Sequence, residues 1–251
     1  MLLRLDHLVI ATPDPDAAAG RLERDTGLVC RGGGRHVAWG TFNRLAWLGD
    51  TFLELIGVFD PALTGNAAVS RAVQAALETG RPDLVTYAIA TDDATADVAR
   101  LRAAGSSIGD VETRSRTRPD GEVVTWHSAT AELGPALPPF IIEHEPGDAE
   151  WNEEVRAARA ADPHRLGGRA RVAGITLPVP DVSLATAAYA ATLGLATDGM
   201  PTVHVGDQEV RLVAGRPPAD PAIIDLEVVG PAGTRPEVDT LGVRFRFRNP
   251  A

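Results

Sequence analysis

The sequence predicts an α+β fold in which repeated βαβββ units form open, cleft-like β-sheets with flanking helices. Apolar strands alternate with short helical segments along the chain, and this alternation is the first observation behind the prediction. The second is a recurrence, because a strand that ends in Thr and leads into an Asp-containing turn appears near residues 12 and 91, with a third copy from residue 172. The 251 residues, 44% of them hydrophobic and 23% charged, suit one large globular domain or two small ones.

The first predicted unit begins with a strand at residues 4–12, whose apolar residues on both faces indicate burial. Pro13 and the aspartates after it supply a turn and a helix N-cap, so we expect a helix over residues 17–25 that ends at Gly27. Glycines at 32–34 and at 49 are expected to form turns between the strands that follow. These strands are expected at residues 28–31, 35–42, 43–48 and 51–58.

The second predicted unit follows a helical segment within residues 66–79 and repeats the order of the first. Its first strand, at residues 84–91, leads into Asp92-Asp93 and then a helix over residues 94–104. Its remaining strands are expected at residues 110–116, 122–129 and 140–145.

A third unit starts at residue 172 and is the least regular of the three. Its helix is expected at residues 184–193, and its strands at 202–205, 209–213, 223–229 and 241–247. The predicted domain organisation therefore has three parts: residues 1–146 hold paired βαβββ units and the cleft, residues 147–171 form a linker helix, and residues 172–251 form a degenerate βαβββ-like unit.

The charge balance restricts the partners. The chain has 24 basic and 34 acidic residues and a net charge of -10, which argues against nucleic acid and anionic membrane surfaces as ligands. Its single cysteine, Cys30, cannot form an internal disulfide, which favours a reducing compartment. The first residues lack a signal-peptide pattern, and no apolar run has membrane-spanning length. We expect a cytoplasmic protein that is a monomer or a homodimer.

Three charged side chains interrupt apolar strands, and such positions are informative because burying an unpaired charge costs several kcal/mol. They are His7, Glu54 and Glu143. Imidazole nitrogens and carboxylate oxygens suit a divalent metal ion, but His7 and Glu54 are far apart in the chain. They form a site only if the first and last strands of the unit are neighbours. The alternatives are a structural, hydrogen-bonded histidine and a Glu54 that pairs with an arginine.

Two stretches of the first unit resemble a known family. Residues 33–43 read Gly-Gly-Arg-His-Val-Ala-Trp-Gly-Thr-Phe-Asn, and residues 49–57 read Gly-Asp-Thr-Phe-Leu-Glu-Leu-Ile-Gly. This pattern is similar to the glyoxalase-like domain family of the vicinal oxygen chelate superfamily, which includes glyoxalase I, extradiol dioxygenases and bleomycin-resistance proteins. The second unit fits as well, with Arg-Pro-Asp-Gly at 118–121 leading to Trp126 and Phe-Ile-Ile-Glu at 140–143. The resemblance covers residues 4–146 and extends to the third unit only in outline.

The resemblance implies that each unit offers a metal ligand on its first strand and another on its last. His7 and Glu54 match these positions in the first unit, and Glu143 matches the last-strand position of the second. The second unit has Thr86 at its first-strand position, and threonine is a poor ligand. The third unit has Gly174 and Arg211 there and cannot bind a metal in this way. A divalent metal of unknown identity at His7 and Glu54 is therefore expected, and a metal-free cleft is the alternative.

The other marked residues of the two stretches are expected to bind substrate in the cleft. Trp39 and Trp126 offer flat apolar walls, although Trp39 also suits a core position. Hydrogen bonds or charge for an oxygen-rich ligand come from His36, Thr41, Asn43 and Arg44.

Three functions remain open at this point. The resemblance implies a lyase, isomerase or oxygenase that transforms a small oxygen-rich metabolite, with Glu143 as general base if it is not a ligand. The first alternative is a metal-free protein that sequesters a small molecule, as resistance proteins of the superfamily do. The second is a structural or interaction role for a degenerate fold.

Overall fold

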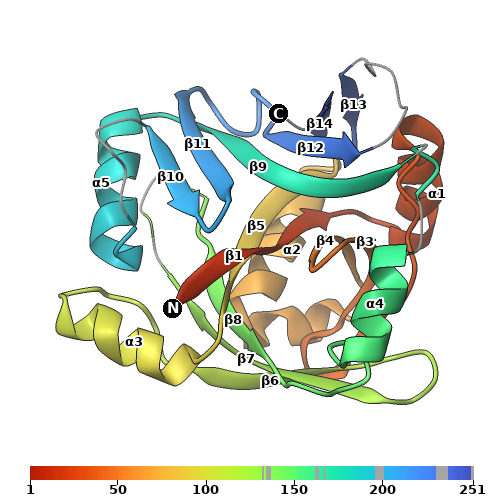
Figure 1. The fold of residues 1–251 in the computed structure, drawn as a ribbon, viewed down its shortest axis with the longest axis horizontal. Helices are drawn as coiled ribbons and strands as arrows, with labels where there is room; N and C mark the ends of the chain where they lie inside the picture. Colours follow the sequence, from red (N-terminus) through yellow and green to blue (C-terminus); the bar gives the residue numbers. More distant parts are fainter. Residues whose placement is uncertain are drawn as a thin grey trace.

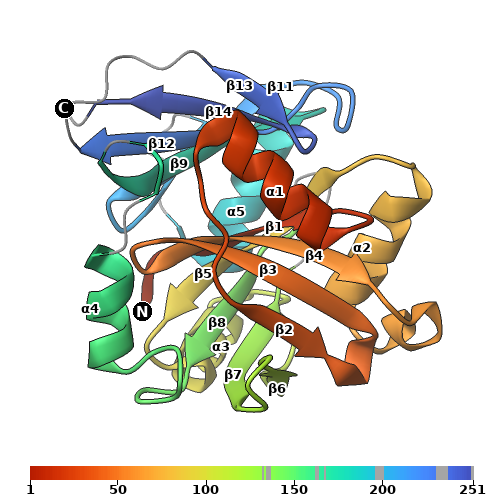
Figure 2. The same ribbon diagram turned by 90° about the vertical axis from the view of Figure 1, so that its right-hand side faces the viewer.

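A closed barrel of eight strands and an open sheet of six strands pack against each other (Figures 1 and 2). The computed structural model describes residues 1–131, 133, 137–161, 164–166, 168–195, 201–229 and 237–249. The α+β fold built from repeated βαβββ units is confirmed, and the two units of residues 1–146 close into the barrel around their common cleft. The division of the chain at residues 146 and 172 stays a prediction.

The first unit supplies four strands of the barrel. They are β1 (Leu2–Ala11), β2 (Gly33–His36), β3 (Thr41–Leu48) and β4 (Thr51–Val58), with a 3₁₀ turn at Val37–Trp39. Helix α1 (Pro15–Thr26) begins where the Asp14 side chain accepts hydrogen bonds from the N–H groups of Asp16 and Ala17, and it ends at Gly27 in the left-handed conformation. A second 3₁₀ turn (Pro61–Asn66) and α2 (Ala68–Glu78) lead to the next unit.

The second unit repeats this order with β5 (Asp83–Thr91), α3 (Ala94–Ala103), β6 (Glu112–Thr117), β7 (Val123–Thr130) and β8 (Phe140–His144). The barrel order is β1-β4-β3-β2-β6-β7-β8-β5. Strands β1 and β5 pair antiparallel, and each pairs parallel with the last strand of its own unit. The two units are therefore related by an approximate two-fold axis through the β1–β5 pair, and they meet again where β2 pairs with β6.

Helix α4 (Glu153–Ala161) follows the barrel, and the open sheet begins with β9 (Arg169–Val179) and helix α5 (Val182–Leu193). The other strands are β10 (Thr202–Val205), β11 (Gln208–Ala214), β12 (Ile223–Val229), β13 (Val238–Thr240) and β14 (Val243–Arg248), in the order β10-β11-β9-β12-β14-β13. The centre of this sheet repeats the barrel pattern, because β9 and β12 pair antiparallel and each has a parallel partner.

The main hydrophobic core lies between the two sheets and includes residues of β1, β5 and β9. Gln208 crosses this boundary, because its Oε1 accepts the N–H of Leu5 at 2.7 Å and its Nε2 donates to the Val172 carbonyl at 2.8 Å. The open sheet is thus fixed to β1 close to His7. Among the described residues, no helix has both the length and the apolar character needed to cross a membrane.

The glycines at 32–34 do more than form a turn, and this differs from the sequence prediction. Gly33 and Gly34 lie within β2, residues 28–31 form no strand, and the strand expected at 35–42 is interrupted by the 3₁₀ turn. A Cβ on Gly34 would lie 2.3 Å from the Thr117 carbonyl oxygen on β6. The absence of a side chain is therefore what lets the two units approach closely enough to close the barrel.

We expect Gly34→Ala to destabilise the protein by about 1–3 kcal/mol, because the added methyl group must push β2 away from β6. The free energy of unfolding in urea measures this. The matched control is Gly65→Ala, since a Cβ on Gly65 would meet no heavy atom within 4 Å. Equal stability of the two variants would show that the barrel does not depend on this close approach.

Candidate active site

The barrel holds a cavity that is partly open to solvent. Side chains of β1, β3, β4, β6, β7 and β8 line it, together with residues of α2 and of the segment before α4. Successive residues of a strand point to opposite faces, so each strand contributes every second side chain. From β3 these are Thr41, Asn43 and Leu45, and from β4 they are Phe52, Glu54 and Ile56.

His7 and Glu54 meet in this cavity. The register of the parallel β1–β4 pair places Glu54 opposite Val9, and the Nε2 atom of His7 lies 3.6 Å from Oε2 of Glu54. Both residues are buried, with 5% and 7% of their surfaces exposed. The His7 ring stacks on Phe52 with 4.5 Å between centroids, which fixes its plane.

Asp6 controls the orientation of His7. Its carboxylate has no exposed surface, and its Oδ1 lies 2.7 Å from Nδ1 of His7 and 3.0 Å from Nε2 of His144. Burial alone would raise the pKa of Asp6, but the attraction and hydrogen bonds of His144 and His7 outweigh it and hold the pKa well below its ordinary value. Because an ionised carboxylate only accepts hydrogen bonds, Nδ1 of His7 carries a proton and Nε2 faces Glu54.

Asn43 holds Glu54 from the other side. Its Nδ2 donates to Oε1 of Glu54 at 2.6 Å, while its own Oδ1 accepts the N–H of Gly34 at 2.8 Å. Oε2 of Glu54, on the side of His7, is left to face the cavity. The backbone N–H of residue 34, where β2 meets β6, thus helps to orient Asn43 and through it Glu54.

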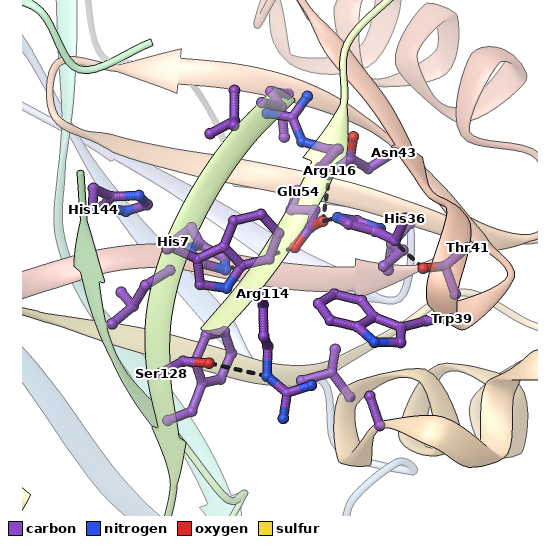
Figure 3. Close-up of a pocket in the computed structure, with 18 of the residues that line it drawn as sticks. His7, His36, Trp39, Thr41, Asn43, Glu54, Arg114, Arg116, Ser128 and His144 are labelled. Carbon is purple, nitrogen blue, oxygen red and sulfur yellow. Dashed lines mark hydrogen bonds and ion pairs between the residues drawn. The ribbon is translucent and has the colours of Figure 1, made fainter. Parts of the chain in front are cut away.

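His36 completes this polar cluster as a neutral imidazole. Its Nδ1 lies 2.9 Å from the Thr41 hydroxyl, and its Nε2 lies 4.0 Å from Oε1 of Glu54. Burial, with smaller contributions from the positive charge of Arg116 and from His7, lowers the pKa of His36 to about 3. His36 therefore stays uncharged at neutral pH. Figure 3 shows His36 between Glu54 and Thr41.

Aromatic rings form the walls beside this cluster. His36 stacks on Trp39 with 5.3 Å between centroids, and Trp126 contacts Trp39 edge to face at 5.9 Å. At another side of the cavity the His144 ring stacks on Trp151 at 3.9 Å. The cavity therefore combines a hydrogen-bonded polar group with flat surfaces for an organic ligand.

Two arginines of β6, Arg114 and Arg116, also line the cavity, and neither was among the predicted site residues. Arg116 donates to Glu150 at 2.7 Å, and both side chains are buried. Arg114 donates from Nε to the Ser128 hydroxyl at 3.1 Å. The signal that could have found them is their spacing of two residues, which places both on one face of the strand.

The structure places two predicted site residues outside the cavity. On β8 the side chains that line it are Phe140, Ile142 and His144, so Glu143 points to the opposite face, where it accepts the N–H of Ala94 at 2.8 Å. This placement removes the geometric basis for Glu143 as general base. Arg44 likewise points away from the barrel interior and pairs with Asp16 at 2.6 Å.

The strand register also corrects the ligand position assigned to Glu143. In the antiparallel β1–β5 pair, His7 lies opposite Ala88 and Val9 lies opposite Thr86. The two-fold axis that relates the units therefore makes His7 equivalent to Thr86 and Val9 equivalent to Ala88. Val9 lies beside Glu54, and Ala88 lies beside Phe140. The position that corresponds to Glu54 in the second unit is therefore Phe140, which has no ligating atom.

A comparison with protein families agrees with this architecture. The sequence profile described as "Glyoxalase-like domain" matches residues 5–193. The chain belongs to the glyoxalase-like domain family. This is the family that the patterns at residues 33–43 and 49–57 resemble.

Solved structures show how far the fold of this glyoxalase-like protein is shared. A hypothetical protein from Staphylococcus aureus aligns with a TM-score of 0.79 and 15% identity over 98% of each chain. Methylmalonyl-CoA epimerase from Streptomyces coelicolor, in complex with 2-nitronate-propionyl-CoA, aligns with a TM-score of 0.45 and 18% identity over 58% of this chain and 100% of that one. The epimerase from Mycobacterium tuberculosis gives 0.42 and 18% over 58% of this chain and 90% of that one. No curated protein matches.

The side chains of this family member fit the expected divalent metal poorly. The first unit offers His7 and Glu54, but the corresponding positions of the second unit hold Thr86, whose hydroxyl donates to the Pro138 carbonyl, and Phe140. Within the described ranges, no group of three His, Cys, Asp or Glu side chains is arranged to hold a metal ion. The four ligands that two equivalent units would supply are thus reduced to two.

We expect His36→Gln to flatten the pH dependence of stability. In the unfolded chain His36 takes up a proton once the pH falls below its ordinary pKa of 6.5, whereas in the folded protein its pKa is about 3. The stability of the folded protein therefore falls as the pH falls from 6.5 to 3. From pH 7 to pH 5 the wild type should lose about 2 kcal/mol more than the variant.

Urea unfolding at several pH values checks this expectation. The control is His204→Gln, because His204 is exposed on β10 and does not line the cavity. A His36→Gln variant with the same slope as the wild type would show that His36 accepts a proton in the folded protein.

Proposed function

We propose that this glyoxalase-like protein is an enzyme that moves a proton on a small, oxygen-rich metabolite held in the barrel cavity. The observation that carries the proposal is the pair formed by Glu54 and His7, whose facing oxygen and nitrogen atoms lie 3.6 Å apart while their other polar atoms are occupied by Asn43 and Asp6. Two proton-accepting groups held side by side at the wall of a partly apolar cavity are suited to general acid–base catalysis.

The proposed reaction begins at a carbon atom next to a carbonyl group. Oε2 of Glu54 takes the proton, and the electron pair of the C–H bond moves to the carbonyl oxygen and forms an enolate. In a 2-hydroxy ketone, the hydroxyl proton passes to the former carbonyl oxygen, and Glu54 returns its proton to the former carbonyl carbon. This ends an isomerisation with no net uptake or release of protons. The reaction class is therefore that of an isomerase or a lyase with an enolate intermediate.

His7 supports this step by accepting the proton from Glu54 in turn. Its Nε2 faces the carboxyl group, and the ionised Asp6 carboxylate beside Nδ1 stabilises the imidazolium that forms. The neutral His36 and the amide of Asn43 keep Oε1 of Glu54 in place. Asp6, His36 and Asn43 are positioning residues in this scheme.

Sequestration of a small molecule without chemistry is the alternative function. The aromatic walls of Trp39, Trp126 and Trp151 favour it, because they could bind an organic ligand whether or not Glu54 reacts. In either case the ligand is a small molecule. The net charge of -10 supports a protein that binds neither nucleic acid nor membranes, and the single cysteine supports a cytoplasmic location.

Hydrogen–deuterium exchange at carbon tests the proposed chemistry across several classes of candidate substrate. The protein is incubated in D₂O with a panel of 2-oxo acids, 2-hydroxy ketones and acyl thioesters, and loss of the carbon-bound proton signal is followed by NMR. We expect Glu54→Gln to slow exchange by about 100-fold or more, because an amide cannot act as the base. His7→Asn should slow it as well.

Glu143→Gln is the matched control, since it removes a similar carboxylate from the outer face of the barrel, where Glu143 contacts α3. Exchange should persist in this variant. Exchange that survives in Glu54→Gln but is lost in Glu143→Gln would reverse the assignment of the base. Tight ligand binding with no exchange of any proton in the wild type would favour sequestration.

A metal requirement is tested on the same reaction. Because the described residues supply two ligating side chains, we expect exchange to continue at more than about half its rate after treatment with EDTA, and elemental analysis to find less than one divalent ion per chain. Loss of exchange on chelation, with recovery on adding Zn²⁺, Mn²⁺ or Ni²⁺, would instead show that the reaction requires a divalent metal ion.

A further inference from the structure

The two cavity arginines of β6 differ in how firmly their charges are held. Arg116 has 5% of its surface exposed, and the side chain of its partner Glu150 has 11%. Separating this pair would leave two uncompensated charges out of water, so the pair persists when a ligand binds. Arg116 is a fixed part of the cavity wall.

Arg114 is paired much more loosely. Its Nη2 lies 2.7 Å from Oε2 of Glu112, whose side chain is 60% exposed. Ion pairs with so exposed a partner are weak, because water solvates the carboxylate almost as well as the arginine does. A ligand carboxylate in the cavity can replace Glu112 at little cost.

The guanidinium of Arg114 is nevertheless held in place on the cavity side. Its side chain is only 15% exposed, its Nε donates to the hydroxyl of Ser128, and its central carbon lies 5.0 Å from the centroid of the Trp39 ring. These contacts occupy Nε and one face of the group, so Nη1, and Nη2 once Glu112 is displaced, can donate to a ligand. Arginine presents such atoms in a planar fork that matches a carboxylate.

The position of Arg114 in the cavity fits an anionic end of the ligand. Figure 3 shows Arg114 and Ser128 at one end of the view and the group of Glu54, His36 and Asn43 at the other, with Trp39 between them. A ligand carboxylate beside Glu54 would be repelled by its charge, whereas one at Arg114 is attracted. The rings of Trp39 and Trp126 then cover the middle of the ligand.

We propose that Arg114 binds a carboxylate of the substrate, which makes the substrate a small organic acid with a flat or apolar middle. The carboxylate lies at Arg114, the middle lies along Trp39 and Trp126, and the carbonyl end lies at Glu54. The location of the reacting carbon rests on the proposed function. The carboxylate site does not.

Isothermal titration calorimetry with two acids and their neutral amides tests the site. The probes are benzoate and phenylacetate, compared with benzamide and phenylacetamide. We expect the wild type to bind the acids about tenfold or more tightly than the amides, as charge-assisted hydrogen bonds require. Arg114→Gln should lose this preference while binding the amides within about twofold of the wild type.

Two further variants sharpen the result. Arg102→Gln is the matched control. Arg102 lies outside the cavity and forms a similar ion pair, with 2.9 Å between its Nη2 and Oδ1 of the exposed Asp110, so its loss should leave the preference for acids intact. Glu112→Gln should tighten acid binding by about two- to fivefold, since it removes a weak competitor for Arg114. Circular dichroism and thermal unfolding confirm that each variant is folded, and Arg114→Lys, which keeps the charge, should retain part of the preference.

The carboxylate site is overturned if the wild type binds acids and amides equally, if it binds neither acid, or if the preference survives in Arg114→Gln. It is distinguishable from the proposed function through Glu54→Gln. That variant should keep the preference for acids while losing hydrogen–deuterium exchange. If the wild type prefers acids to amides but exchanges no carbon-bound proton, Arg114 remains the carboxylate site and Glu54 is not the catalytic base.

Discussion

The carboxylate of Asp6 lies without exposed surface between two imidazoles, and the candidate site depends on this contact. An ionised group in such a position is stable only while its hydrogen-bond donors stay in place. Asp6 therefore fixes His7 and His144 together, although they come from the first and last strands of the barrel half of the chain. It also determines which nitrogen of His7 faces Glu54.

The open sheet contributes to this arrangement from outside the barrel. Gln208 satisfies the backbone N–H of Leu5, the residue before Asp6, and at the same time bonds to the first strand of the open sheet. The outer face of β1 is packed in the core between the two sheets. The third unit thus supports the first strand of the site without supplying a described residue to the cavity.

The sequence could predict the fold from patterns that recur within the chain. The meeting of His7 with Glu54 was implied by the resemblance to the glyoxalase-like domain family. The recurrence of the strand–Asp–helix pattern identified the units, and the isolated charges in apolar strands identified the two residues. The glycines at 33 and 34 were interpreted as a turn because the sequence does not show which backbone will approach them. The need for glycine at position 34 becomes visible only in the pairing of β2 with β6, where a side chain would collide with the Thr117 carbonyl.

The errors at Glu143 and Arg44 have a common physical cause. Side chains of a strand alternate between the two faces of a sheet. An error of an odd number of residues in aligning two strands therefore places a side chain on the wrong face. Aligning Glu143 with Glu54 involved such an error, and the parallel register of β5 and β8 shows Phe140 instead. The same alternation explains why Arg114 and Arg116 were not among the predicted cavity residues.

The two halves of the barrel have the same outline but different contents. His7 and Glu54 lie in one half, and Thr86 and Phe140 occupy the matching places in the other. A flat intermediate in the cavity would therefore meet the carboxyl group from one side only. Removal and return of hydrogen would then take place on a single face of the molecule, so the asymmetry between the repeats would decide the handedness of the product.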